Sequence, residues 1–446
     1  MGAFWRRDIF IILVTGILLY FGSSWQFSKK DVDAAIYQCD ATAFWQGQSG
    51  LQHLPVEQCA FLNQKGSVVD FVIESMIRHH VPHPIVQVAQ SQNAMTQFHT
   101  LPREYPVLSL IPFSLPLIAP AQFYQQAYAL WAILVVILLY FVIKRYTSWG
   151  NAMLFMASMI IAGWSTAASR FDLFPAALTL GALILANRGR WSWAYVFIMM
   201  GILLKFYPVL LLPPLFIAEQ KSYNYQWNAW QRWKAFAIGL VVFAGIGLTS
   251  LATSIPGTIG SLQYFKSRPL EIESFPGALV WLAHYVGYPY QYKYSFVSMN
   301  VISSISDTIG TLSTTTLIIG LLLIIWLQWR GKLDVSTTCL VVMALVLGTS
   351  KIVSPQYMIW IIPLVWYVGK SNLRWIIPWG VVMILTFFIY PVVYNSASPP
   401  PEILFLLGLV RGLVLLGFVV IMLWRHAMLP KIEQREVAVQ EVLVQS

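Results

Sequence analysis

The sequence predicts an all-α, polytopic integral membrane protein, because it is too apolar and too poor in charge for a soluble domain. Of its 446 residues, 58% are hydrophobic and 10% are charged, and the mean hydropathy is +0.65. Soluble domains typically have about 45–50% apolar and about 25% charged residues. Apolar runs recur from residue 9 to residue 424. Stretches such as 317–327 lack the alternation of polar and apolar residues that a transmembrane β-barrel requires.

The basic residues have the distribution of a membrane protein, and no nucleic-acid partner is expected. The formal net charge is +10, but Lys and Arg form short clusters between apolar runs instead of one basic face. The clusters are Arg6/Arg7, Lys144/Arg145, Arg188/Arg190, 221–234, Arg330/Lys332, Lys370/Arg374 and 425–435.

These clusters also predict the topology. If all of them are cytoplasmic, an even number of crossings separates each consecutive pair. Two crossings per interval give about 12 transmembrane helices with both termini cytoplasmic. The first helix follows Arg6 and Arg7 and has no signal-peptidase-like site after it, so it is expected to remain uncleaved. The prediction is one membrane domain over residues 1–428, followed by a short cytoplasmic tail at 429–446.

Each interval must then contain a segment that faces outward. The predicted outward segments are 23–122, 169–172, 205–208, 254–307, 350–357 and 390–402. Within the first, the apolar stretch 107–119 is broken by prolines and is expected to be juxtamembrane or re-entrant. At 205–208 a single kinked helix over 191–218 is the alternative. Basic clusters on both flanks favour two short helices, which would place Lys205 deep in an outward-facing cavity.

Ionisable residues gather in these outward segments, whereas mid-helix positions are almost purely apolar, with Arg411 as the main exception. Charges at membrane depth are costly unless they are paired or hydrated, which makes them functional candidates. Charges from five separate segments predict one ion-lined cavity at the outer membrane face.

Ordinary structural explanations remain open for most of these residues. Asp31 and Asp33 could merely solvate a loop, and Arg170 could form a structural ion pair with Asp172. Lys205 and Lys351 could extend from helix ends towards water. Tyr105, Tyr207 and Tyr357 could be interfacial aromatic residues, which membrane proteins enrich.

Cysteine and histidine give further constraints. Cys39 and Cys59 share the first outward segment, where an oxidising compartment would permit a disulfide, and two free thiols are the alternative. Five histidines in the same segment have irregular spacing and no cysteine partner, so no zinc site is expected.

Several short motifs, taken in order, resemble glycosyltransferase family 87 of the GT-C superfamily. That family includes the polyprenyl-phosphate-mannose-dependent α-(1,2)-mannosyltransferases of bacterial envelopes. The resemblance extends from about residue 8 to residue 425. The motifs are Asp33-x3-Tyr37 with Ala43 and Gly47, Glu104-Tyr105-Pro106, Ser169-Arg170-Phe171-Asp172, Lys205-Phe206-Tyr207-Pro208, Arg268-Pro269-Leu270-Glu271-Ile272-Glu273-Ser274, and Ser350-Lys351 with Pro355-Gln356-Tyr357.

This resemblance implies a GT-C-like fold, a lipid-linked sugar donor and a catalytic carboxylate in the first extracytoplasmic loop. Such a carboxylate takes the proton from the acceptor hydroxyl as its oxygen attacks the anomeric carbon. Fixed cations stabilise the departing phosphate, and the candidates are Lys351, Lys205, Arg268 and Arg170. The substrate-binding candidates are Tyr37, Glu104, Tyr105, Asp172, Tyr207, Glu271, Glu273, Gln356 and Tyr357.

Asp33 is the expected catalytic base, in preference to Asp31. Asp33 has the family's spacing to Tyr37 and lies further from Lys29 and Lys30. A carboxylate held by lysines would be a weaker base.

The predicted function is that of an inverting membrane glycosyltransferase. It would move a hexosyl unit, with mannose as the expected sugar, from a polyprenyl-phosphate sugar to a lipid or glycan acceptor at the extracytoplasmic face of the cell membrane. A flippase for lipid-linked sugars is the alternative, although it would have to open to both sides. Asp31-Val32-Asp33 resembles a metal-binding D-x-D pattern, but a monophosphate donor among several cations has less need of a metal. No obligatory cofactor is therefore expected.

Overall fold

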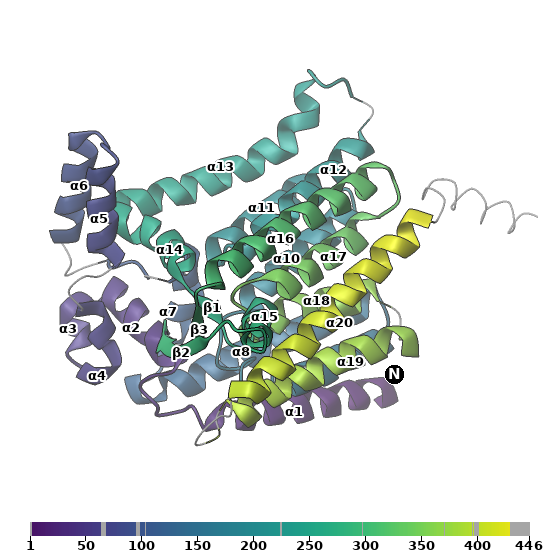
Figure 1. Cartoon of the computed structure of the whole chain (residues 1–446), viewed down its shortest axis with the longest axis horizontal. Helices are drawn as coiled ribbons and strands as arrows, with labels where there is room; N and C mark the ends of the chain where they lie inside the picture. Colours follow the sequence, from purple (N-terminus) through teal and green to yellow (C-terminus); the bar gives the residue numbers. More distant parts are fainter. Residues whose placement is uncertain are drawn as a thin grey trace, which may run out of the picture.

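The computed structural model describes residues 2–63, 68–94, 99–102, 104–223, 225–296, 298–369, 371–394, 396 and 401–428. The predicted tail at 429–446 lies outside these residues. The described chain is mainly helical, with one small sheet (Figure 1). The predicted all-α membrane fold is therefore confirmed.

Six helices of the described chain are long and apolar enough to cross a membrane, judged by length and composition. A helix of about 20 residues matches the roughly 30 Å hydrocarbon core of a bilayer. These helices are α1 (Gly2–Ser24), α8 (Tyr124–Tyr146), α13 (Trp230–Thr253), α16 (Ser306–Trp329), α19 (Leu373–Phe387) and α20 (Pro401–Met428).

Shorter helices meet in pairs at three of the predicted outward turns. Helices of 11 to 15 residues cover only about 17–23 Å, so a turn between two of them lies below the level that a full span would reach. The pairs are α9 (Trp149–Ala162) with α10 (Leu173–Asn187), α11 (Trp191–Leu204) with α12 (Leu212–Ser222), and α17 (Val335–Thr349) with α18 (Met358–Val368).

The region 191–222 forms two helices, as predicted, and not one kinked helix. Lys205 has an extended backbone after α11, and a 3₁₀ turn at Tyr207–Leu211 precedes α12. Tyr195, near the start of α11, donates a hydrogen bond to Glu219 near the end of α12, with an O···O distance of 2.6 Å. The chain therefore doubles back at Lys205. The total of about 12 crossings stays a prediction.

The first predicted outward segment is built from small helices beside the bundle. They are α2 (Asp33–Trp45), α3 (Gly47–Leu51), α4 (Val56–Cys59), a 3₁₀ turn at Ala60–Asn63, α5 (Val68–Arg78), α6 (His83–Ala94) and the short apolar helical stretch Val107–Ile118, which contains α7 (Leu110–Ser114). A further 3₁₀ turn at Ala121–Phe123 leads into α8.

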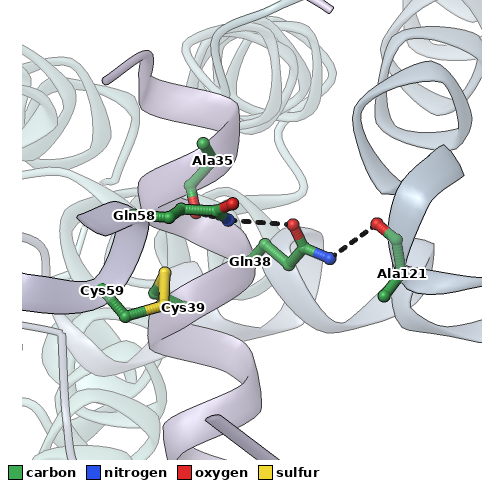
Figure 2. The surroundings of a disulfide bond; sticks show 6 residues. All are labelled: Ala35, Gln38, Cys39, Gln58, Cys59 and Ala121. Atoms are coloured by element: carbon green, nitrogen blue, oxygen red, sulfur yellow. Dashed lines mark hydrogen bonds between the residues drawn. A yellow bond between two sulfur atoms is a disulfide. The ribbon is translucent and has the colours of Figure 1, made fainter. Parts of the chain in front are cut away.

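A disulfide holds α2 in this segment. Cys39 and Cys59 are bonded, with their Cα atoms 5.6 Å apart, and join α2 to α4 (Figure 2). Beside them, Gln58 Nε2 donates to the Gln38 side-chain oxygen at 3.0 Å. Gln38 Nε2 in turn donates to the carbonyl of Ala121 at 2.8 Å. Helix α2 is thus tied both to α4 and to the segment that leads into α8.

The second long outward segment contains a small antiparallel sheet that the sequence analysis did not predict. Its strands are β1 (Leu270–Glu271), β2 (Tyr290–Ser295) and β3 (Ser298–Ser303), in the order β1-β3-β2. Glu271 pairs with Asn300 and Lys293 pairs with the same residue from the other side. Helices α14 (Ile255–Ser267) and α15 (Phe275–His284) flank β1 in the sequence.

One end of the helix bundle brings basic clusters together. Figure 1 shows the N-terminus and the C-terminal end of α20 on the side away from α2–α6. Lys221, from one of the basic clusters, donates to the carbonyl of Trp329 at the end of α16, at 3.3 Å. Basic clusters that are distant in the sequence therefore meet at one end of the bundle.

A labelling experiment tests the orientation. Cysteines introduced at the exposed positions Gln291 and Asn228 should react from opposite sides of the membrane, because Gln291 lies in the second long outward segment and Asn228 in a basic cluster. In intact cells, an impermeant maleimide should label Gln291→Cys, and Asn228→Cys should react only after permeabilisation. The native chain is the control, since Cys39 and Cys59 are bonded and Cys339 is buried. Equal labelling of both variants in intact cells would contradict the predicted topology.

Candidate functional site

All six predicted outward segments contribute to one pocket of about 360 Å³. Eleven of the predicted site residues line it, namely Asp33, Glu104, Tyr105, Arg170, Lys205, Tyr207, Arg268, Glu271, Glu273, Gln356 and Tyr357. The expected gathering of ionisable groups from separate segments is thus present in the structure. Tyr37, Asp172 and Lys351 are not among the described residues that line the pocket.

Asp33 lies at the first position of α2 and pairs with Arg170. The side chains of Asp33 and Arg170 are 11% and 17% exposed, so the pair lies in the wall of the pocket. Lys30, by contrast, pairs with Glu57 at 2.8 Å. Asp33 is thus separated from the lysine pair, as expected, but it has a different cation as its partner.

Asp172 and Lys205 form a second buried pair. Lys205 Nζ lies 2.6 Å from Asp172 Oδ1, and the Asp172 side chain is 1% exposed. The Trp360 indole N–H donates to the same oxygen of Asp172. Arg170 therefore does not pair with Asp172, its neighbour in the motif, and Lys205 does not extend to water.

Aromatic rings enclose the Lys205 ammonium. Its Nζ lies 4.8 Å from the ring centre of Phe171, 5.1 Å from those of Tyr357 and Trp360, and 5.7 Å from that of Tyr105. Such contacts stabilise a cation when water is excluded. Lys205 is therefore held in one place by a carboxylate and by rings from several segments.

Trp360 is a pocket residue that the sequence analysis missed. Its ring lies between those of Tyr207 and Tyr357, with centroid distances of 4.2 Å and 3.9 Å. In the sequence it stands in an apolar run, and the only signal was its position one helical turn after Tyr357. Stacked aromatic rings at a pocket wall provide apolar faces together with polar edges.

Tyr37 supports the pocket from behind. It is 1% exposed and stacks on Phe113, with a centroid distance of 4.1 Å. Its hydroxyl lies 3.4 Å from Asp33 Oδ2, one turn earlier on α2, and donates a hydrogen bond to it. The spacing from Asp33 to Tyr37 thus orients the carboxylate.

Arg268 and Glu271 connect two walls of the pocket. Arg268 Nη2 donates to Glu271 Oε1 at 3.3 Å and to the Ser298 hydroxyl at 3.1 Å. The other carboxylate oxygen of Glu271 accepts the backbone N–H of Val353 at 2.8 Å. Burial raises the pKa of Glu271, and the Arg268 charge opposes that effect. Both oxygens of Glu271 are thus used within the protein.

Glu273 differs from Glu271. In the part of the chain that the structure describes, its buried Oε2 has no hydrogen-bond partner. Burial and the neighbouring Glu271 raise the pKa of Glu273 well above its ordinary value. Glu273 therefore has hydrogen-bonding capacity to offer a bound molecule.

Lys351 lies beside the pocket and is not among the described residues that line it. Its backbone carbonyl accepts the N–H of Glu271 at 2.9 Å, which joins segments 350–357 and 268–274. Burial and the nearby Arg268 lower the pKa of its amine. Ser350, Ser354 and Gln356 line the pocket from this segment instead.

The sixth outward segment also supplies residues that the analysis missed. Tyr390 and Tyr394 line the pocket, and the Tyr394 hydroxyl accepts the backbone N–H of Met299 at 3.1 Å. Neither tyrosine could be predicted as a pocket residue from the sequence, where both lie in or near a Pro-rich stretch. Among the described residues, no group of three or more His, Cys, Asp or Glu side chains could hold a metal ion.

The fold and the pocket define a multi-span membrane protein with one composite polar site where its short helices meet. Residues 104–355 match the family model of glycosyltransferase family 87. The chain belongs to this family and is a glycosyltransferase. No curated protein and no solved structure matches it.

The matched range includes most of the pocket, from Glu104 to Pro355. Asp33, Tyr37, Gln356 and Tyr357 fall outside it. The fold nevertheless brings Asp33 next to the matched range, because Asp33 pairs with Arg170, which lies inside it.

The buried pair predicts a large effect on stability. Lys205→Met leaves the Asp172 carboxylate buried without its cation, which should lower the free energy of unfolding by about 3–5 kcal/mol. Denaturant unfolding in detergent measures this loss. A double variant, Lys205→Met with Asp172→Asn, should recover part of it. Lys30→Met is the control, because Lys30 is exposed and should change nothing measurable. Equal stability of Lys205→Met and native protein would contradict the role of the pair.

Proposed function

We propose that this glycosyltransferase is an inverting enzyme that moves a hexosyl unit, with mannose as the expected sugar, from a polyprenyl-phosphate donor to a lipid or glycan acceptor. The reaction would take place at the extracytoplasmic face of the cell membrane. The observation that carries the proposal is that the pocket combines ionic side chains with apolar side chains at the turns between short apolar helices. These two sets of residues are called its ionic part and its apolar part.

The apolar part supports a donor that carries a lipid chain. Phe206, Val209 and Leu210 line it from the turn between α11 and α12, and Val346 lines it from α17. Val209 is 44% exposed and lies in the 3₁₀ turn between α11 and α12. A water-soluble nucleotide sugar gains little from such a wall, whereas a prenyl chain buries apolar surface against it.

The ionic part supports a phosphate and a sugar. Arg170, Lys205 and Arg268 lie around the pocket with little exposure to solvent. Arginine can bind phosphate oxygens with two N–H groups, and cations in a site with little water stabilise the charge that develops on a leaving phosphate. The tyrosine and tryptophan rings supply apolar faces for the sugar ring.

Asp33 is the proposed general base. Its carboxylate would take the proton from the acceptor hydroxyl while the new oxygen–anomeric-carbon bond forms and the bond to the phosphate oxygen breaks. The pairing of Asp33 with Arg170 adds a step to this scheme. A phosphate in the pocket would compete with Asp33 for Arg170, and this competition would release the carboxylate for proton transfer.

The direct test is turnover in detergent micelles. Purified protein should transfer label from polyprenyl-phosphate mannose to a lipid-extract acceptor without any vesicle. Transfer in micelles would exclude a flippase as the sole function, because micelles have no second compartment. Polyprenyl-phosphate glucose and GDP-mannose are the comparison donors. Use of GDP-mannose in place of both lipid donors would overturn the proposed donor class, and preference for the glucosyl lipid would overturn only the sugar.

Replacing Asp33 should slow the chemical step without weakening the binding of the donor. Asp33→Asn keeps the shape but removes the proton acceptor, so kcat should fall about 10²-fold or more. Donor binding should be retained or become tighter, because Arg170 no longer pairs with a carboxylate. Asp31→Asn is the matched control, since Asp31 is exposed and lies two residues away. Turnover of both variants with labelled donor provides the measurement. An inactive Asp31→Asn with an active Asp33→Asn would reverse the assignment.

We also propose that the enzyme needs no divalent metal, because three cationic side chains already surround the pocket. Activity should persist after dialysis against EDTA. A complete loss that Mg²⁺ or Mn²⁺ restores would contradict this proposal.

A further inference from the structure

Arg411 is a buried cation near the middle of α20 that does not line the pocket. It is 2% exposed. Its Nη2 donates to the backbone carbonyls of Glu273 and Val353, both at 3.0 Å. Among the described residues, no carboxylate oxygen lies within 4.0 Å of its nitrogens. A cation in a spanning helix is costly and needs strong partners. Here the partners are carbonyl groups in two separate pocket walls.

The same two walls are joined at other points. The N–H of Glu271 donates to the carbonyl of Lys351 at 2.9 Å, and the N–H of Val353 donates to the Glu271 carboxylate at 2.8 Å. The segments 268–274 and 350–357 therefore lie side by side, and Arg411 fixes both of them to α20.

Two glycines bring α20 close enough for this contact. A Cβ atom at Gly408 would lie 2.6 Å from the carbonyl oxygen of Glu273, and one at Gly412 would lie 2.6 Å from the Cβ of Phe275. Cβ contacts this short force a shift of the neighbouring atoms. Gly408, Arg411 and Gly412 thus form one docking surface for the backbone that carries Glu273.

The Glu273 carboxyl lies in the field of several charges. Burial and Glu271 raise its pKa, whereas Arg411, Arg268 and Arg170 act in the opposite direction. Tyr390 and Tyr394 also interact electrostatically with it. Removing the Arg411 charge would therefore raise the pKa of Glu273 further.

We propose that Arg411 is a positioning residue of the transferase site, which holds the wall carrying Glu273 against the wall carrying Gln356 and Tyr357. Arg411 acts through Glu273 and does not touch the substrate. The part of this inference that is tested by turnover rests on the proposed function. The first readout therefore does not depend on activity.

The first readout is hydrogen exchange of the full-length protein in detergent. Arg411→Met and Gly408→Ala should both accelerate exchange in 268–274 and 350–357, because both changes break the contact with α20. Gly417→Ala is the matched control on the same helix, since a Cβ there meets nothing within 4 Å. Exchange in both segments that matches the native protein would overturn the proposal. Gly408→Ala keeps the test available if Arg411→Met does not fold.

The second readout is the pH profile of kcat/KM with the lipid donor. Arg411→Met should lower kcat/KM about tenfold or more. It should also move the limb of the pH profile that is set by the pKa of Glu273 to higher pH. Arg411→Lys retains the charge and should keep that limb near its native position. In a Glu273→Gln background, Arg411→Met should produce no further shift.

Two results would overturn the role through Glu273. One is a pH shift that persists in the Glu273→Gln background. The other is a native pH profile identical to that of Glu273→Gln. Absence of turnover in the native protein would instead contradict the proposed function, and the hydrogen-exchange result would still stand.

Discussion

The pocket depends on ion pairs and hydrogen bonds that link one predicted outward segment to another. Asp33 of the first segment pairs with Arg170 of the second, and Asp172 of the second pairs with Lys205 of the third. The Glu271 carboxylate joins the fourth segment to the fifth through Val353. A buried charge is tolerated only with a partner, so these contacts require distant parts of the chain to meet. The groups proposed for chemistry are therefore also the groups that assemble the site.

The general location of the site could be predicted from sequence, because basic clusters mark one end of each helical hairpin and leave the other end for the polar turns. The pairing within the site could not. Arg170 and Asp172 are two residues apart in one turn, yet their partners come from other segments, and only the packed fold decides which way each side chain points. The backbone contact of Lys351 could not be predicted for the same reason, since its carbonyl accepts the N–H of Glu271 and so joins two walls of the pocket. Trp360 was missed because an apolar run hides one aromatic residue among many.

The helices that hold the site are shorter than those around it, and this difference explains how charged groups can lie at membrane depth. Every residue from Thr337 to Thr349 of α17 is buried, whereas only 6% of the spanning window of α16 is buried. Helix α17 is thus enclosed by the bundle, whereas α16 lies at its surface. The polar turns at their ends face the pocket and not the hydrocarbon, which satisfies the rule that irregular backbone at this depth must be enclosed by protein or line a cavity.

The arrangement of long helices outside and short helices inside has a consequence for the lipid around the protein. Because α13 and α16 match a full bilayer, the surrounding membrane meets a surface of normal hydrophobic thickness and does not have to thin. The shorter helices lie inside the protein, where α11 has only 14 residues and Lys205, which directly follows it, lines the pocket. On the proposed function, a lipid-linked donor would enter this pocket from the bilayer and keep its prenyl chain against the apolar side chains that line it. Its head group would then reach the polar side chains of the pocket without any thinning of the surrounding bilayer.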